Sequence, residues 1–500
     1  MDRILSEPAD SDLIVRLIRS EFAGPEPEAA LRWLDRLQSV EGGESAAFQD
    51  TLDFIRLRTA KKAKAQFSTQ NREKALQILD SYLSVRPLDV DILERKSNVL
   101  LKTEDREQCF ECLKAVLAVS PARGSALLVC VKANALDDRI DEATRWCRRA
   151  IAADPADESL RDRLVGLKIR AGDAEGALAD CLTLLEKSPD NPAATAHSVN
   201  LLTRLNQPYA ADMAFDRLVE LQRRMLPPEL APALAALDGP VRRKPIPADS
   251  LEWAWEISKR RDLGYDAWSY AATWGQRAVD LFKSVWRYQP ERHSEIADIV
   301  ETPDTALGEL RSAVASGRET MVVTAHLGAM PLIFHVLSYG DFPVCFHAAS
   351  RFVPVPGRNH RTLIHATGRT LVETRELLSA VSEGTTVAVA VDSYADASSV
   401  RQPFLGRRIR FSQFPARLIA RKRARSFYFS AYWTGVEGRL RDELVPLPDP
   451  PSGGGDRDAV REWERGWRAA VLTQMERYMT GDPVNLNLSG GVWRCQADYC

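Results

Sequence analysis

The strongest candidate for catalysis is a histidine that follows a short apolar stretch. The segment MVVTA at 321–325 is typical of a buried strand, and His326 comes next, in the turn T-A-H-L-G. Pro331 then opens an apolar segment that predicts a helix. A histidine at the carboxyl end of a strand, beside a helix N-terminus that favours negative charge, suits a general base that activates a hydroxyl. A lone histidine is more often structural, so its position leaves both roles open.

Strands and helices alternate around this histidine. Apolar runs predict strands at 321–325, 342–348, 385–392 and 426–433. Amphipathic segments predict helices at 331–340, 370–384 and 414–424. This order is typical of an α/β domain with a mostly parallel sheet, in which chemistry gathers where strands end.

Several of these segments resemble one enzyme family. VVTAHLGAMPLIFHVLS, Arg351, TRELLSAVSEGTTVAVAVDS and QPFLGRRIRFSQFPARLIARKRA are similar to the lipid A late acyltransferases, which have a lysophospholipid acyltransferase-like fold. The similarity covers roughly 300–450. In that family a strand leads into H-x-x-x-x-D/E, with the histidine as base and the acid orienting it. The resemblance implies acyl carrier protein thioesters as donors and a glycolipid hydroxyl as acceptor.

The resemblance assigns roles to individual residues. His326 matches the family histidine, and Asp392 matches the acid that ends the next strand, so both are expected to be catalytic. Basic residues near the family's basic positions, and those of the F-x-G-x segment that begins at Phe404, are expected to bind substrate: Arg351, Arg375, Arg407 and Arg408.

Pro331 departs from the family pattern, because it stands where the family has its aspartate or glutamate. In a serine-protease-type triad, loss of the acid that orients a histidine lowers turnover by about 10⁴-fold. Three outcomes remain open. Another carboxylate substitutes (Asp341, Glu373 and Asp392 are candidates), turnover is slow, or the domain is non-catalytic.

The first half of the chain repeats every 34 residues. Prolines recur at Pro87, Pro121, Pro155 and Pro189, and small residues recur at Ala75, Cys109, Ala143, Ala177 and Ala211. Each unit ends in an amphipathic helix that a proline terminates. The pattern resembles the tetratricopeptide repeat over 54–223, about five repeats, whose units must stack to bury their apolar faces. We expect a helical cap at 1–53, a linker at 224–250 and the acyltransferase-like α/β domain at 251–500.

The repeat also explains a motif with redox or zinc spacing, Cys109-x-x-Cys112. Cys109 occupies the small-residue position of its repeat, and Cys147 and Cys181 share another repeat position. No second CxxC pair completes a zinc site. We therefore expect these thiols to pack in the core as small apolar side chains.

Two clusters allow two interpretations each. The aromatic segment 251–290 holds five tryptophans, which would pack a helical pair onto the next domain or form a patch at lipid-headgroup depth. The basic residues between Arg407 and Arg425 would dock acyl carrier protein, anionic lipid or a phosphorylated glycolipid, or would form a solvated helix face.

Composition limits the remaining possibilities. The chain has 500 residues and a formal charge of −2, and no nucleic-acid-binding motif accompanies its basic run, so we expect no nucleic acid partner. It has no signal-peptide core and no apolar run of about 18 residues, which predicts a soluble cytoplasmic protein and leaves peripheral association with the inner face of the membrane open. Expected partners are acyl carrier protein, a membrane surface or glycolipid, and a protein bound by the repeats. No cofactor is expected beyond acyl-ACP or acyl-CoA as co-substrate.

Two hypotheses follow. The first is a peripheral acyltransferase that moves a fatty acyl group onto a hydroxyl or amine of a glycolipid or polysaccharide terminus, with His326 as base. Relatives of this fold also occur with surface-polysaccharide export systems. The alternative is a non-catalytic lipid- or carrier-binding scaffold that acts through its repeats. A two-lobed sugar transferase ranks last, since about 250 residues are short for two Rossmann-like lobes.

Overall fold

The structure of the chain is a computed structural model. It describes residues 11–23, 27–40, 45–68, 71–103, 105–237, 246, 248–301, 307–340, 342–348, 352–353, 360–364, 370–392, 399–434, 438–451, 457–488 and 490–495. The chain divides into two compact units, Met1–Leu167 and Lys168–Cys500, which are described separately.

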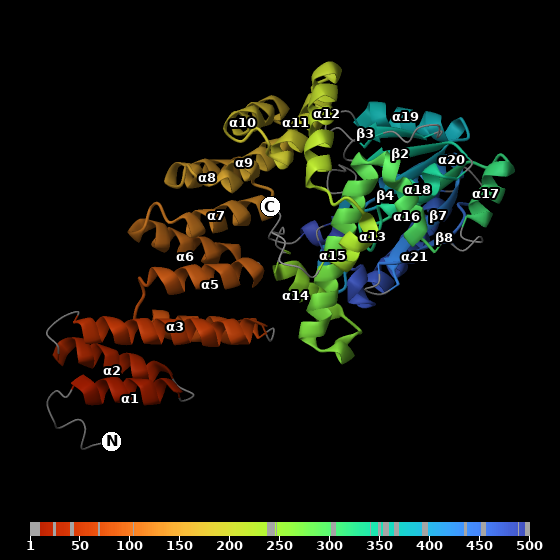
Figure 1. Cartoon of the computed structure of the whole chain (residues 1–500). Helices are drawn as coiled ribbons and strands as arrows, with labels where there is room; N and C mark the ends of the chain where they lie inside the picture. The colour runs from red at the N-terminus through yellow and green to blue at the C-terminus, as the bar shows by residue number, and fades with distance from the viewer. Residues whose placement is uncertain are drawn as a thin grey trace. The chain divides into compact units, whose positions relative to one another are not determined.

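The first unit is built from helices (Figure 1). They are α1 Ser11–Ala23, α2 Pro27–Val40, α3 Ala46–Ser68, α4 Arg72–Leu83, α5 Val90–Thr103, α6 Arg106–Val119, α7 Gly124–Leu136, α8 Ile140–Ala153 and the start of α9, Glu158–Ala171. Contacts join α3 to α4, α5 to α6 and α7 to α8, so successive helices form pairs. This confirms the helical repeat, and α1 and α2 lie within the range expected for the helical cap.

The 34-residue spacing has a direct physical cause in these pairs. The small residues Ala75, Cys109 and Ala143 are fully buried in the second helix of their pairs, where a larger side chain would hold the helices apart. Helix starts recur at the same interval. The carboxylate of Asp105 accepts a hydrogen bond from the Gln108 amide at the start of α6.

The cysteines pack as expected. All six cysteines whose side chains the structure describes are buried. The Cys109 thiol donates to the Ser97 carbonyl, and the Cys147 thiol donates to the Leu160 carbonyl, both at 3.3 Å. Burial raises the pKa of Cys109 and of Cys130 to about 12, so these thiols stay protonated and unreactive at neutral pH. Among the described residues, no cluster of three or more His, Cys, Asp or Glu forms a metal site.

The second unit contains the last repeat helices as well as the α/β domain. These helices are α10 Ala174–Lys187, α11 Pro192–Arg204 and α12 Pro208–Met225. Phe215 on α12 shares an apolar cluster with Tyr288, and Arg223 donates to the Tyr288 carbonyl at 3.2 Å. The boundary between the compact units lies inside α9, whereas the sequence predicts that the repeats end at 223. The two positions differ because the repeat spacing does not show which neighbour a helix packs on.

A six-stranded sheet forms the centre of the α/β domain, in the order β3-β2-β4-β1-β7-β8. Its strands are β1 Thr320–Thr324, β2 Val344–Ala348, β3 His360–Ile364, β4 Thr386–Ala390, β7 Arg425–Trp433 and β8 Leu440–Pro446. Neighbouring strands are parallel except β7 and β8, which are antiparallel. This confirms the expected mixed, mostly parallel sheet and its four predicted strands.

Helices cover both faces of this sheet (Figure 1). One face packs on α14 Ala248–Ile257, α19 Thr370–Ser382, α20 Phe414–Lys422 and α21 Arg457–Thr480. The other packs on α13 Leu230–Ala235, α15 Tyr265–Tyr288, α16 His293–Ile299, α17 Gly308–Ala315 and α18 Leu332–Ser338. β1 is buried along its whole length, as a central strand between two helical layers must be. Helix α13 lies within the expected linker and is packed into the domain.

A separate two-stranded hairpin follows β4. It consists of β5 Ser399–Phe404 and β6 Arg407–Ser412, paired antiparallel. The sequence pattern does not predict this hairpin, nor β3 and β8, because charged residues and Pro403 interrupt the apolar pattern that identifies a strand. Among its described residues the domain also has four short 3₁₀ segments: η1 Arg261–Leu263, η2 Pro290–Arg292, η3 Pro483–Asn485 and η4 Gly491–Cys495.

The aromatic segment 251–290 is largely core. Trp253, Trp268, Trp274 and Trp286 are buried, which confirms the packing interpretation for these four. Two tyrosines in the first turns of α15, Tyr265 and Tyr270, are about half exposed. Within the described part of the chain, no helix is both long enough and apolar enough to cross a bilayer.

Candidate active site

His326 and Asp392 form a hydrogen-bonded pair at the carboxyl edge of the sheet. The Nδ1 atom of His326 lies 2.8 Å from Oδ1 of Asp392. The Asp392 side chain is fully buried, whereas a third of the His326 side chain is exposed. Because the carboxylate can only accept, Nδ1 carries the proton and Nε2 keeps its lone pair as a base.

The register of two parallel strands brings these residues together. Thr324 on β1 pairs with Ala390 on β4, and the Val391 amide continues this pairing by donating to the Thr324 carbonyl at 2.8 Å. His326 and Asp392 each lie two residues beyond the paired positions, so they face each other at the same edge. Their separation of 66 positions in the sequence hides this relationship.

Three N–H groups hold the Asp392 carboxylate. The His326 ring donates to Oδ1, the His326 amide lies 3.0 Å from Oδ2, and the Val492 amide donates to Oδ2 at 3.0 Å. Burial alone would raise the pKa of Asp392, but the His326 ring and the two amides outweigh it and hold that pKa below its usual value. Asp392 is therefore ionised and fixed in place beside the histidine.

A pair of glycines covers this dyad. A Cβ added at Gly491 would lie 1.7 Å from Oδ2 of Asp392, and one added at Gly490 would lie 2.8 Å from the His326 Cβ. Only glycine lets the backbone approach closely enough for the Val492 amide to reach the carboxylate. Neither glycine was predicted to be part of the site, although the adjacent glycines of NLSGGVW are a signal of close backbone approach.

Pro331 does not remove the acid from the histidine. It lies just before α18, and Asp392 supplies the carboxylate from the neighbouring strand instead. Of the other two candidates, Asp341 and the Glu373 side chain lie outside the described residues.

The turn after His326 presents fewer unoccupied backbone N–H groups to a negative charge than the sequence predicts. The Leu327 amide donates to the Ala325 carbonyl, Gly328 to Asn485, Ala329 to Ala431 and Met330 to Leu327. These internal hydrogen bonds occupy the amides that the expected helix N-terminus would have presented. Stabilisation of an oxyanion would therefore depend on side chains.

The predicted substrate-binding arginines occupy different surroundings. Arg351 lies outside the described residues. Arg375 is exposed near the start of α19, and among the described residues no hydrogen bond or ion pair links it to the dyad. Arg407 is half-buried over the Trp253 ring, 5.2 Å from its centroid, and pairs with Glu256 at 3.5 Å. Arg408 is exposed on β6.

The basic run from Arg407 to Arg425 is divided among several surfaces rather than forming one face. Arg425 pairs with Asp449 at 2.8 Å, and Lys422 lies 3.8 Å from Glu319. Arg408 and Arg417 remain exposed. Part of the run is therefore neutralised within the fold.

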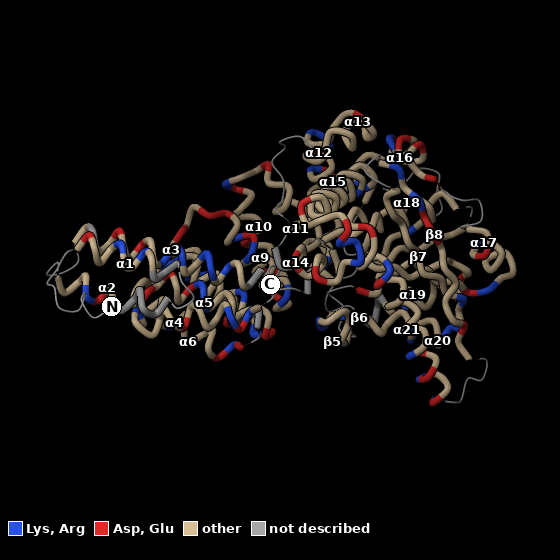
Figure 2. The backbone as a smooth tube through the Cα atoms, turned by 90° about the horizontal axis from the view of Figure 1, so that it is seen from below, with Lys and Arg blue, Asp and Glu red and all other residues tan. Residues whose placement is uncertain are grey.

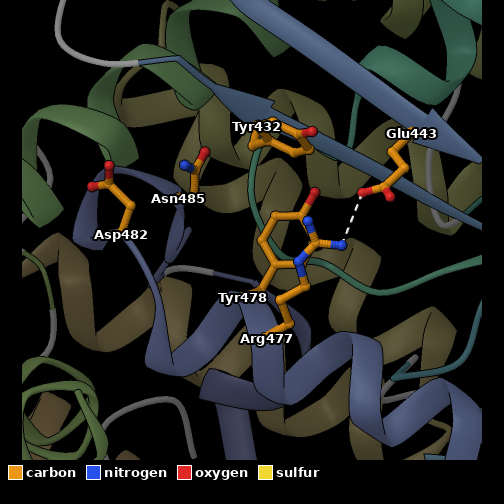
Figure 3. A pocket seen from close by; sticks show the side chains of 6 residues that line it. All are labelled: Tyr432, Glu443, Arg477, Tyr478, Asp482 and Asn485. Atoms are coloured by element: carbon orange, nitrogen blue, oxygen red, sulfur yellow. Dashed lines mark hydrogen bonds and ion pairs between the residues drawn. The ribbon is translucent and has the colours of Figure 1, made fainter. Parts of the chain in front are cut away.

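A small cavity lies among β7, β8, the end of α21 and η3 (Figure 3). It has a volume of about 130 Å³, and its lining residues are Tyr432, Glu443, Arg477, Tyr478, Asp482 and Asn485. The Asn485 carbonyl accepts from the Gly328 amide at 2.8 Å, which places one cavity wall against the turn. Ligand pockets usually enclose roughly 300–1,000 Å³, so this cavity is too small to hold a fatty acyl chain.

Comparisons with known proteins give one relative and several repeat structures. No protein-family model matches the chain. It is 24% identical over 506 residues to the Vi polysaccharide export protein VexE of Salmonella typhi, covering 97% of this chain and 70% of that protein. The crystal structure of MamA (15% identity, TM-score 0.30) matches 33% of this chain and 95% of its own. That of YrrB, a TPR protein with an unusual peptide-binding site (15% identity, TM-score 0.30), matches 36% and 94%. TM-scores this low carry no argument, so the repeat assignment depends on the helix pairs described above.

Proposed function

We propose that this chain is an acyltransferase that moves a fatty acyl group from a thioester to a hydroxyl or amine of a glycolipid or polysaccharide terminus. The observation that carries the proposal is the His326–Asp392 dyad: a buried, ionised carboxylate orients the ring, and the histidine side chain is partly exposed to a substrate. The lipid A acyltransferase-like segments identified in the sequence support the same chemistry.

The reaction follows from the protonation states of the dyad. Nε2 of His326 removes the proton from the acceptor hydroxyl as its oxygen attacks the thioester carbonyl. Asp392 stabilises the imidazolium that forms and remains ionised throughout. The tetrahedral intermediate then breaks its C–S bond, and the thiolate takes the proton from Nε2. The products are an ester of the acceptor and a free thiol on acyl carrier protein or CoA.

The proposed acceptor rests on the relative's name and on the resemblance. The Vi polysaccharide export protein is named for export of a polysaccharide, and acylation of a glycan terminus would give such a polymer a lipid end. The repeats would bind a protein partner in this process, and the sheet domain would meet acyl carrier protein and the glycolipid at the membrane surface.

A non-catalytic scaffold is the second candidate. The specific observation in its favour is that the amides after His326 are all occupied by internal hydrogen bonds, so the turn itself offers no oxyanion donor. In this alternative the domain would bind a lipid or a carrier protein, and the helix pairs would assemble a complex around it.

Mass spectrometry of the cell's glycolipids and polysaccharide termini separates the two candidates. Strains carrying the wild-type chain, His326→Ala, or His197→Ala as a histidine control on α11 would be compared at equal protein abundance. Loss of one acyl mass in His326→Ala alone supports the enzyme and identifies its acceptor. An unchanged profile in a folded, abundant His326→Ala chain excludes catalysis by this histidine.

A further inference from the structure

The cavity of Figure 3 has a buried floor and a charged rim. Its six lining residues divide by exposure: Tyr478 and Asn485 are buried, Tyr432 and Glu443 are half-buried, and Arg477 and Asp482 are exposed. Because β7 runs parallel to β1, Tyr432 near the end of β7 lies at the same sheet edge as His326. Ligands of mostly parallel sheets usually bind outside this edge.

One hydroxyl group on the cavity floor has no hydrogen-bond partner. The Tyr478 side chain is only 9% exposed, and its hydroxyl makes no hydrogen bond to the residues that the structure describes. Burial raises the pKa of Tyr478 despite the nearby Ser430, so the hydroxyl stays protonated and can both donate and accept. Figure 3 shows this hydroxyl directed toward Tyr432. A buried polar group without a partner is costly, and a hydroxyl of a ligand in the cavity would satisfy it.

The other polar groups of the lining are held in place and still have hydrogen-bonding capacity. The Asn485 side chain accepts from the Trp433 amide at 2.7 Å and donates to the Trp433 carbonyl at 3.2 Å. Its amide nitrogen carries two hydrogens, so a second donor remains. Arg477 donates to Glu443 at 3.1 Å, and each keeps further donors or acceptors. The lining therefore offers both donors and acceptors at fixed positions.

The charge and the aromatic rings of the lining favour a neutral ligand with a partly apolar surface. The two carboxylates, Glu443 and Asp482, outnumber the one guanidinium, Arg477, so an anion would be repelled. Acidic and basic residues also both occur along β8 and α21 around the cavity (Figure 2). The rings of Tyr432 and Tyr478 lie 6.3 Å apart at 65° to each other and present apolar surface.

We propose that this cavity binds one neutral sugar ring of the glycan acceptor. A sugar has hydroxyl groups that donate and accept, and C–H groups that pack on aromatic rings. At about 130 Å³ the cavity lies below the usual range for larger ligands, roughly 300–1,000 Å³, so it suits a single ring. The Asn485 carbonyl accepts from the Gly328 amide at 2.8 Å, so one wall of the cavity contacts the turn that begins at His326. The identity of the glycan rests on the proposed acyltransferase function, but sugar binding can be measured without turnover.

Saturation-transfer NMR on the full chain tests the site. The probes are the methyl glycosides of glucose, galactose, N-acetylglucosamine and N-acetylgalactosamine, with glucuronic acid as a charged competitor. We expect wild type to bind at least one neutral probe. Tyr478→Phe should bind that probe about two- to tenfold more weakly, because it loses one hydrogen bond. Tyr209→Phe makes the same change at an exposed position on α12 and should bind like wild type.

Thermal unfolding separates a loss of binding from a folding defect. Tyr478→Phe removes a buried hydroxyl without leaving another group unpaired, so the thermal midpoint of the free chain should stay the same or rise slightly. At the facing ring, Tyr432→Phe should bind the probe more tightly than Tyr432→Ala, since the ring supplies the packing surface.

Three results overturn the sugar site: no probe binds wild type, Tyr478→Phe binds the probe as tightly as wild type does, or glucuronic acid binds more tightly than every neutral probe. Acyl transfer by a chain that binds no neutral sugar would likewise reject the site and leave the enzyme intact. Sugar binding by a chain that transfers no acyl group would support the site and reject the acyltransferase.

Discussion

The replacement Gly491→Ala tests most directly whether the dyad depends on its glycine cover. The new Cβ would lie 1.7 Å from Oδ2 of Asp392, whereas such atoms normally approach no closer than about 3.4 Å. The carboxylate must therefore retreat by about 1.5 Å or the backbone must lift, and either movement breaks the hydrogen bond from Val492. Gly491 also has a φ of +33°, which alanine rarely adopts.

The expected loss of turnover can be bounded from both sides. A misplacement of about 1 Å costs on the order of 10²-fold, and complete loss of an orienting acid costs about 10⁴-fold in a serine-protease-type triad. We therefore expect Gly491→Ala to reduce acyl transfer between about 10²- and 10⁴-fold. Gly491→Ala should also lower the free energy of unfolding by about 1–3 kcal/mol, because the buried Asp392 carboxylate loses a hydrogen-bond donor.

The assay would measure the acylated fraction of glycan termini over time, together with thermal unfolding of the purified chain. Gly466→Ala is the matched control, because a Cβ there meets nothing within 4 Å on the exposed side of α21. It should keep full activity and gain up to about 1 kcal/mol of stability from helix propensity. Wild-type transfer by Gly491→Ala would refute the view that the glycine cover positions Asp392 for catalysis.

Four further outcomes are expected. Asp392→Asn should lower acyl transfer by up to about 10⁴-fold at unchanged abundance, since an amide cannot hold the same tautomer of His326; near-wild-type transfer would show that the carboxylate does not orient the ring. The folded chain lowers the pKa of Asp392, so the stability it contributes is present above about pH 4 and lost as the pH falls through the lower folded value. Urea titrations should therefore show the difference in unfolding free energy between wild type and Asp392→Asn shrinking from pH 6 to pH 3, and a constant difference would contradict the linkage. Cys109 and Cys130, with pKa raised to about 12, should resist iodoacetamide at pH 8 until the chain is unfolded, as peptide mass spectrometry would report; rapid native labelling would count against their burial. Ala143→Leu should cost about 1–3 kcal/mol by overpacking a fully buried position, while the exposed Ala152→Leu should leave chemical denaturation curves unchanged.

Local spacing was sufficient to predict the repeats and much of the sheet. A small residue lets two paired helices approach closely, so the recurrence of Ala75, Cys109 and Ala143 at 34-residue steps identifies the pairs. Central parallel strands are buried on both faces, so they appear as continuous apolar runs such as 321–325 and 385–392. The edge strands and the hairpin mix apolar with charged residues, so β3, β5, β6 and β8 were not predicted.

The candidate site depended on tertiary structure. His326 and Asp392 were recognisable by type and by their positions after strands, but the sequence could not show that β1 and β4 are neighbours or that their register aligns the two residues. Gly491 acts through close backbone approach, a property of the folded chain that no periodicity records. Arg407 and Arg408 are adjacent in sequence yet lie on opposite faces of the hairpin, because side chains alternate along a strand. The sequence therefore determined which residue types were present near the strand ends, and three-dimensional pairing decided which of them meet.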